Sequence, residues 1–274
     1  MKVAVHLRGG PNRTNVRSEA IADGFYALGH HVEYLPRSEA SKTADLVVQT
    51  GFCDTTALKG AIDRQMPYIV MEAPPFRTLC DEAEWSSWGY NGLAGGAYRP
   101  EAPDEERPAP STAPRKEAGD TLIIGQKPTD HSLRGSDHIG WLKAKLRESP
   151  WAKLRHHPLM VDPPCTIEEA LDGVQSVITY TSTVGVDAAV AGCEVIVEGP
   201  GSWWIQGVER EAHLHALSWA AFSNLSFAQP KYIGHILSGY DEAAALAAEG
   251  TVEVPRGKID GRAICQQYYQ QVIR

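Results

Sequence analysis

The sequence contains no long apolar run. Its longest hydrophobic stretches fall well short of the ~20 residues that a helix needs to span a bilayer. At the N-terminus, the apolar part of MKVAVHLRGG is too short for a signal peptide, because Arg8 and two glycines follow it directly. We therefore expect a cytoplasmic protein without a membrane anchor.

The sequence also lacks closely spaced cysteines and an excess of positive charge. The five cysteines are scattered without a CxxC pair, which argues against both a disulfide framework and a cysteine-ligated zinc site. His213 and His215 have acidic neighbours but no clear third ligand, so we expect no metal site. The formal net charge of −8 argues against a protein that binds nucleic acid through its overall charge, although a local basic patch remains compatible with it.

What the chain does contain is an alternation of β-branched apolar runs with amphipathic segments. The expected strands are residues 2–7, 31–35, 44–50, 67–73, 121–126, 151–155, 174–180 and 193–199. The expected helices are residues 16–28, 55–65, 136–149, 166–172, 239–249 and 260–273, with a short Ala-rich helix before 193. Strands separated by single helices imply right-handed βαβ units and mainly parallel sheets. The fold class is α/β, with two Rossmann-like domains facing a cleft.

A change of composition divides the chain. Residues 99–118 hold five prolines and many charges but almost no large apolar side chain, as expected for a linker or an exposed loop. The predicted domains are therefore residues 1–98 and 119–255, and a terminal helical segment follows at 256–274.

Two motifs in the second domain are expected at the same edge of a sheet. Ser182 and Thr183 follow a strand and precede a helix, where backbone N–H groups favour an anion, and Gly185 would leave room for its close approach. Helix capping is the other explanation for these hydroxyls. His157-Pro158 closes the strand at 151–155, so the imidazole is also expected at the carboxyl edge.

The ordered pair Arg155–Pro158 and Ser182–Ile196 resembles GT-B glycosyltransferases, in particular those with an HP motif and a later S-S/T motif, such as the capsule Kdo transferases and bacterial polysialyltransferases. In that group the two motifs bind the nucleotide and the phosphate of the sugar donor. The resemblance therefore implies donor-binding roles for His157, Ser182 and Thr183. It also implies a nucleotide-sugar as co-substrate without another cofactor, and a C-terminal helix that crosses back to the N-terminal domain.

The first loop of the second domain extends this resemblance. In GT-B enzymes that loop faces the donor phosphates, which places Gly125 and Gln126 at the donor and lets Lys127 and Arg134 neutralise a diphosphate leaving group. The segments 122–135 and 88–97 also resemble small GT-B-like bacteriophage proteins. Some of these glycosylate hydroxymethylated pyrimidines in phage DNA, which would place the protein in the host cytoplasm.

The acceptor is then expected at the N-terminal domain. The segment HLRGGPNRTNVR carries Arg8, Arg13 and Arg17 without an acid, and these side chains could contact acceptor phosphates or be solvated. An inverting transfer needs a general base. The candidates are two strand-end carboxylates, Glu72 and Asp54, of which Asp54 could instead cap the following helix.

The sequence thus predicts a metal-independent glycosyltransferase, with a 5-hydroxymethyl pyrimidine in phage DNA as the preferred acceptor. A glycan or a lipid-linked acceptor is the direct alternative. Two further hypotheses remain open: a nucleotide-sugar epimerase of the same architecture, and a nucleotide-binding or DNA-binding module without catalysis.

Overall fold

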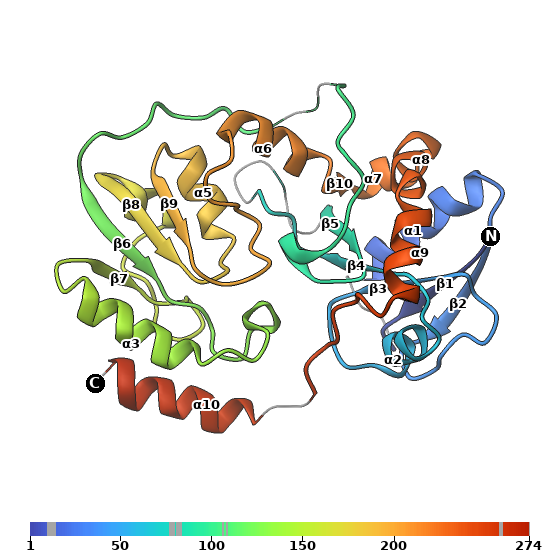
Figure 1. Cartoon of the computed structure of the whole chain (residues 1–274), viewed down its shortest axis with the longest axis horizontal. Helices are drawn as coiled ribbons and strands as arrows, with labels where there is room; N and C mark the ends of the chain where they lie inside the picture. Colours follow the sequence, from blue (N-terminus) through green and yellow to red (C-terminus); the bar gives the residue numbers. More distant parts are fainter. Residues whose placement is uncertain are drawn as a thin grey trace. The chain divides into compact units, whose positions relative to one another are not determined.

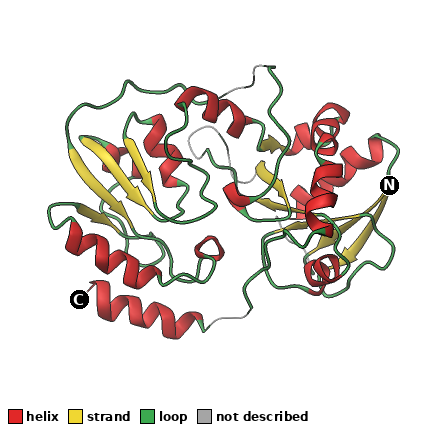
Figure 2. Cartoon of the chain, in the orientation of Figure 1, coloured by secondary structure: helices red, strands yellow, loops and turns green. Residues whose placement is uncertain are grey.

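The chain folds into two compact α/β units (Figures 1 and 2). The structure is a computed structural model that describes residues 1–9, 15–76, 80, 84–105, 107, 109–257 and 260–273. Unit 1 comprises Met1–Ala109 and His215–Gly257, and unit 2 comprises Pro110–Leu214 and Lys258–Arg274. Helix α6 (Arg210–Ser218) contains the second boundary between the units.

Unit 1 is built on a six-stranded sheet in the order β10-β5-β4-β3-β1-β2. Its strands are β1 (Lys2–Leu7), β2 (His31–Pro36), β3 (Leu46–Thr50), β4 (Tyr68–Glu72), β5 (Trp85–Tyr90) and β10 (Ala221–Ser223). The first four are parallel, as the sequence predicts, whereas β5 and β10 join the sheet antiparallel. Neither antiparallel strand is predicted by the sequence pattern.

Alternating side chains divide the core of unit 1 between the two faces of this sheet. Val3 and Val5 of β1 face one core, whereas Ala4 between them faces the other. The first face is covered by α1 (Asn15–Ala27), α7 (Asn224–Phe227), α8 (Pro230–Ser238) and α9 (Tyr240–Ala248). The second face is covered by α2 (Thr56–Asp63) and by the chain around a short 3₁₀ turn at Ala94–Gly96.

Unit 2 is built on a four-stranded parallel sheet in the order β7-β6-β8-β9. Its strands are β6 (Asp120–Ile124), β7 (Lys153–Arg155), β8 (Val174–Thr179) and β9 (Glu194–Val197). Its helices are α3 (His138–Glu148), α4 (Ile167–Leu171), α5 (Val184–Val190) and α10 (Gly261–Tyr268), with a 3₁₀ turn at His131–Leu133 and a π turn at Tyr269–Ile273.

The same alternation organises the core of unit 2. Ile123 and Ile178 face α3 and α10, which lie side by side on one face of the sheet (Figure 1). Val195 and Thr179 point to the opposite face, where α5 packs against them at Gly185. Both faces of the sheet are thus covered by helices, as parallel sheets require.

The division into units differs from the predicted domains. Residues 215–255, which fall within the predicted domain 119–255, belong to unit 1, where Tyr90 Oη donates to the carbonyl of Ile236 at 3.0 Å. The terminal segment 256–274 was predicted to cross back to the N-terminal domain. Instead α10 buries Tyr268 in the core of unit 2.

The predicted linker 99–118 contains no helix or strand in its described residues, and the boundary between Ala109 and Pro110 lies within it. Its two parts are bound to different units. The Arg99 guanidinium donates to the carbonyl oxygens of Trp88 at 2.5 Å and Ala94 at 2.8 Å, and burial lowers its pKa to about 9. Further along, the Ala113 N–H donates to the carbonyl of Val190. In the described part of the chain no helix has the length and apolarity to cross a bilayer.

Candidate functional site

The parallel sheet of unit 2 brings the predicted donor-binding segments to one edge. Because β6, β7 and β8 run parallel, the loops that leave their carboxyl ends lie next to one another. These loops begin at Gly125, His156 and Tyr180. Two contacts join them: the Gly125 N–H donates to the carbonyl of Arg155 at 2.8 Å, and Gln126 bonds to Thr181. We call this region the donor edge.

The side chain of Gln126 is committed to holding these loops together. Its Oε1 accepts the Thr181 N–H at 2.8 Å, and its Nε2 donates to the Thr181 hydroxyl at 3.0 Å and to the Ser132 hydroxyl at 3.3 Å. The side chain is buried, 4% exposed, so its amide is enclosed by protein. In this structure Gln126 positions the two loops of the donor edge rather than presenting its amide to a ligand.

His138, as a neutral imidazole, accepts a hydrogen bond from the backbone of the same loop. Its Nε2 accepts the Gln126 N–H at 3.0 Å, which places the proton on Nδ1. Burial lowers the pKa of His138 to about 4, against the opposing effect of the Asp130 and Asp137 carboxylates. The folded chain therefore binds this proton less readily than the unfolded chain, whose histidine pKa is ordinarily about 6.5.

His138 should make the protein sensitive to acid. The stabilisation is complete above the unfolded pKa and is lost as the pH falls from 6.5 toward 4. Between pH 7.5 and pH 5 we expect about 2 kcal/mol of lost unfolding free energy from this residue. His138→Gln retains an acceptor for the Gln126 N–H and should remove that part of the loss in urea unfolding at the two pH values. The exposed His131→Gln is the matched control; equal acid loss in all three proteins would contradict the assignment.

Gly125 is required by close packing at the end of β6. A Cβ there would lie 2.9 Å from the Tyr268 hydroxyl oxygen and 3.3 Å from the carbonyl oxygen of Arg155. That hydroxyl forms a 2.9 Å hydrogen bond with Nδ1 of His156, and burial lowers the pKa of His156. Of the two neighbouring histidines, His156 is thus bound to α10 within the core.

His157 stands in the turn that follows β7 and is only half-buried. Its Nδ1 accepts the Leu159 N–H at 3.1 Å, so the neutral ring carries its proton on Nε2. Its carbonyl accepts the N–H groups of Met160 and Val161, which fixes the turn around Pro158. The backbone therefore orients the imidazole so that its Nε2–H group can donate a hydrogen bond.

The hydroxyl cluster after β8 divides into buried and accessible members. Thr179 and Thr181 are buried, and the Thr179 hydroxyl accepts the Ser182 N–H at 3.2 Å. Ser182 and Thr183 are half-buried. The Ser182 hydroxyl accepts the Val184 N–H at 3.2 Å, so it caps the first turn of α5 and keeps its proton available for donation.

Gly185 faces protein rather than solvent. A Cβ there would lie 3.3 Å from Val195 Cγ1, 3.4 Å from Trp204 Cβ and 3.5 Å from Thr179 Cγ2. The missing side chain therefore lets α5 pack closely on β8 and β9, which differs from the predicted reason for this glycine.

The two predicted cations of the first loop differ in their surroundings. Arg134 donates from Nη1 to the carbonyl oxygens of Ser132 at 3.0 Å and Pro200 at 2.8 Å, which joins the β6–α3 loop to the loop after β9. Lys127 is half-buried, and its ammonium has no hydrogen bond or ion pair with any residue that the structure describes. Of the pair, Lys127 is the cation that the fold does not already use.

Unit 1 places both predicted carboxylates at the carboxyl edge of its own sheet. Glu72 ends β4, and its Oε1 accepts the Phe52 N–H at 2.7 Å, so the carboxylate lies beside the loop that follows β3. Asp54 is exposed in that loop. The helix cap is Thr55, whose hydroxyl accepts the Leu58 N–H at 3.2 Å, so capping does not explain Asp54.

A second arginine that the sequence reasoning missed lies beside Arg8. Arg37 follows β2, and its Nη2 stands 3.9 Å from the position of a Cβ on Gly51, where Nη2 of Arg8 stands 3.6 Å away. The pKa of Arg37 is lowered, chiefly by burial and also by the neighbouring charge of Arg8, against the opposing effects of Cys53 and Glu72. The Arg37 guanidinium thus lies near both Arg8 and the Glu72 carboxylate. The signal available in the sequence was the position of Arg37 directly after a strand.

The structure gives little information on the other predicted acceptor-binding residues, and it shows no metal-ligand cluster in the described residues. Arg17 lies half-buried near the start of α1, and Arg13 lies outside the described residues. In the described ranges no group of three or more His, Cys, Asp or Glu side chains is placed to hold a metal ion. Nε2 of His213 is hydrogen-bonded to the carbonyl of Trp203, and Nε2 of His215 to the carbonyl of Pro103, each at 2.9 Å.

Comparison with solved structures finds similar folds among sugar transferases. Thermosulfurimonas dismutans KpsC, beta Kdo 2,4 transferase, has a TM-score of 0.53 and 17% identity, over 89% of this chain and 98% of that chain. KpsC, beta Kdo 2,7 transferase, from the same organism has a TM-score of 0.50 and 13% identity, over 85% and 98%. No protein-family model and no curated protein sequence matches the chain. At these identities the likeness is one of fold.

Proposed function

We propose that the protein is a glycosyltransferase that moves a sugar from a nucleotide-sugar to an acceptor hydroxyl. The observation that carries the proposal is the donor edge, where a parallel sheet joins the His157 turn to the Ser182–Thr183 turn in a chain with the fold of two Kdo transferases. The GT-B class and independence of a metal ion are parts of the same proposal.

The donor would bind by its phosphates at the donor edge. His157 Nε2–H and the Ser182 and Thr183 hydroxyls are donors suited to phosphate oxygens. The Lys127 ammonium supplies positive charge for the leaving group. Gln126 and Arg134 hold the loops that carry these donors, and so they act as positioning residues.

The chemistry needs one proton acceptor. The acceptor oxygen attacks the anomeric carbon while the bond from that carbon to the phosphate oxygen breaks. The hydroxyl proton passes to the Glu72 carboxylate, with Asp54 as the alternative base, and the electron pair leaves with the nucleotide phosphate. Arg37 near Glu72, with Arg8 next to it, favours an acceptor that carries negative charge.

Two acceptor classes fit this charge. An anionic saccharide is favoured by the likeness to Kdo transferase structures. Hydroxymethylated phage DNA, the preference from the sequence, is favoured only by the arginines of unit 1, since no comparison supports it. The two arginines could bind the negative charge of either acceptor class, so an experiment must distinguish the two acceptors.

The test is a matrix of UDP-, GDP- and CMP-sugars, each with an anionic oligosaccharide, with hydroxymethylated DNA or with no acceptor. Nucleotide release and acceptor mass are measured together. A mass increase of one sugar unit on either acceptor supports the proposal and identifies the acceptor. Isomerised nucleotide-sugar without acceptor would indicate an epimerase. Thermal stabilisation by nucleotide with no turnover in any combination would indicate a binding module and contradict transferase activity.

A further inference from the structure

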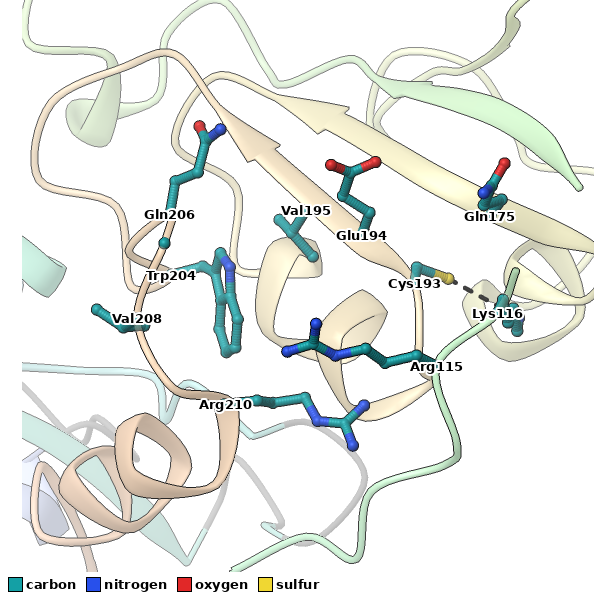
Figure 3. Close-up of a pocket in the computed structure, with 12 residues that line it drawn as sticks. Arg115, Lys116, Gln175, Cys193, Glu194, Val195, Trp204, Gln206, Val208 and Arg210 are labelled. Atoms are coloured by element: carbon teal, nitrogen blue, oxygen red, sulfur yellow. Dashed lines mark hydrogen bonds between the residues drawn. The ribbon is translucent and has the colours of Figure 1, made fainter. Parts of the chain in front are cut away.

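A pocket lies along the edge strand β9 of unit 2 (Figure 3). Its volume is about 540 Å³, within the range of small-molecule sites. Gln175 and Glu194 stand at the amino ends of β8 and β9, opposite to the ends from which the donor-edge loops leave. None of the predicted donor-binding residues lines this pocket, although Gly185 packs against two residues that do, Val195 and Trp204.

The lining is rich in positive charge. It contains Arg115, Lys116 and Arg210 but a single carboxylate, Glu194. In the described part of the chain the Arg115 side chain makes no hydrogen bond or ion pair, and it is exposed. In Figure 3 its guanidinium extends across the pocket in the direction of Trp204. Among the described residues, the Arg115 guanidinium is therefore available to bind a ligand.

The other two cations are held in place by the protein. Arg210 donates to the carbonyl of Ala113 at 3.0 Å and to the Thr112 hydroxyl at 3.1 Å, and it forms an ion pair with Glu211 at 2.8 Å. These contacts fix one guanidinium as a wall of the pocket. Lys116 donates to the carbonyl of Leu171 at 2.7 Å, so its ammonium is bound to the backbone.

The remaining wall suits a hydroxylated ring. Trp204 is 8% exposed, and its indole is held edge-to-face against His213 with the ring centroids 5.1 Å apart. Gln206 carries an amide, which both donates and accepts hydrogen bonds as sugar hydroxyls do. Gln175 donates from Nε2 to the carbonyl of Glu117 at 2.9 Å, which leaves its Oε1 as an acceptor. Planar guanidiniums match a carboxylate or a phosphate through paired hydrogen bonds.

We propose that this pocket binds an anionic saccharide, a sugar unit that carries a carboxylate or a phosphate. Arg115 holds the anionic group, and Arg210, whose charge is paired with Glu211, forms the wall beside it. Trp204 and the two glutamines contact the sugar ring. The site takes its ligand without turnover and is separate from both predicted substrate sites.

The test is a binding titration of the whole chain, by calorimetry and ligand-observed NMR, with four probes. Glucuronic acid and glucose 6-phosphate are the anionic saccharides, and glucose and inorganic phosphate are the matched neutral sugar and bare anion. We expect at least one anionic saccharide to bind about tenfold more tightly than either control. Whichever of the two binds then identifies the anionic group. Equal affinity for inorganic phosphate, or no saturable binding of either anionic sugar, would overturn the proposal.

Arg115→Ala should weaken that binding about tenfold and leave the thermal midpoint unchanged, because the fold does not use this side chain. Arg147→Ala removes an exposed arginine from α3, outside the pocket, and is expected to leave the affinity unchanged. Unchanged affinity in Arg115→Ala would also overturn the proposal, because binding would then occur elsewhere on the chain.

Discussion

Replacing His157 by alanine is expected to weaken nucleotide binding by about tenfold or more while the chain remains folded. The physical reason is the loss of an oriented donor, since Nδ1 accepts the Leu159 N–H and so fixes the proton on Nε2. The fold should survive because the turn is also held by the carbonyl of His157, which accepts two backbone N–H groups that alanine would still bond. Calorimetric titration with the released nucleotide measures the change.

The neighbouring histidine provides the matched control. His156 is hydrogen-bonded to Tyr268 inside unit 2, so His156→Phe should lower the unfolding temperature and leave nucleotide affinity within about twofold. If His157→Ala binds nucleotide as the parent does, His157 does not belong to the donor site. If instead both variants lose affinity in proportion to stability, the effect is one of folding.

Glu72→Gln is expected to lower kcat by about 10²–10⁴-fold with donor affinity unchanged. The amide retains an oxygen that can accept the Phe52 N–H, so the loop after β3 should keep its position. What the amide cannot do is take the acceptor proton. Single-turnover kinetics with saturating donor measure the loss separately from binding.

Asp54→Asn is the corresponding control, because Asp54 is exposed and lies in the same loop. Turnover should remain normal in this variant if Glu72 is the base. Normal turnover in Glu72→Gln would contradict its role, and loss of turnover in Asp54→Asn alone would transfer the role to Asp54.

The parallel parts of both sheets could be predicted because their strands are apolar runs separated by helical periods. β5 could not, since its sequence WSSWGY has neither an alternating pattern nor a continuous β-branched run. β10 has only three residues. The association of residues 215–257 with unit 1 depends on contacts such as the donation from Asn91 Nδ2 to the carbonyl of Ala243, which join residues far apart in the sequence.

The sequence predicts which loops lie at the donor edge better than it predicts which atoms each side chain contacts there. Strand ends identify the loops, so Gly125, His157 and Ser182 all fall at the donor edge as the pattern indicates. The sequence does not show which polar side chains are hydrogen-bonded within the protein. Gln126 and Arg134 were predicted as donor ligands, whereas their side chains bond to protein atoms. Whether Ser182, Thr183 and Lys127 contact a donor stays a prediction.

The central claim is that a nucleotide-sugar binds at the donor edge, and hydrogen-exchange mass spectrometry of the whole chain tests it most directly. Exchange is compared with and without saturating amounts of the nucleotide that the release assay selects. We predict slower exchange in the peptides that cover residues 124–127, 156–161 and 180–186, and unchanged exchange along β9 and the segment to residue 210. Slower exchange confined to peptides outside the donor edge would contradict the account.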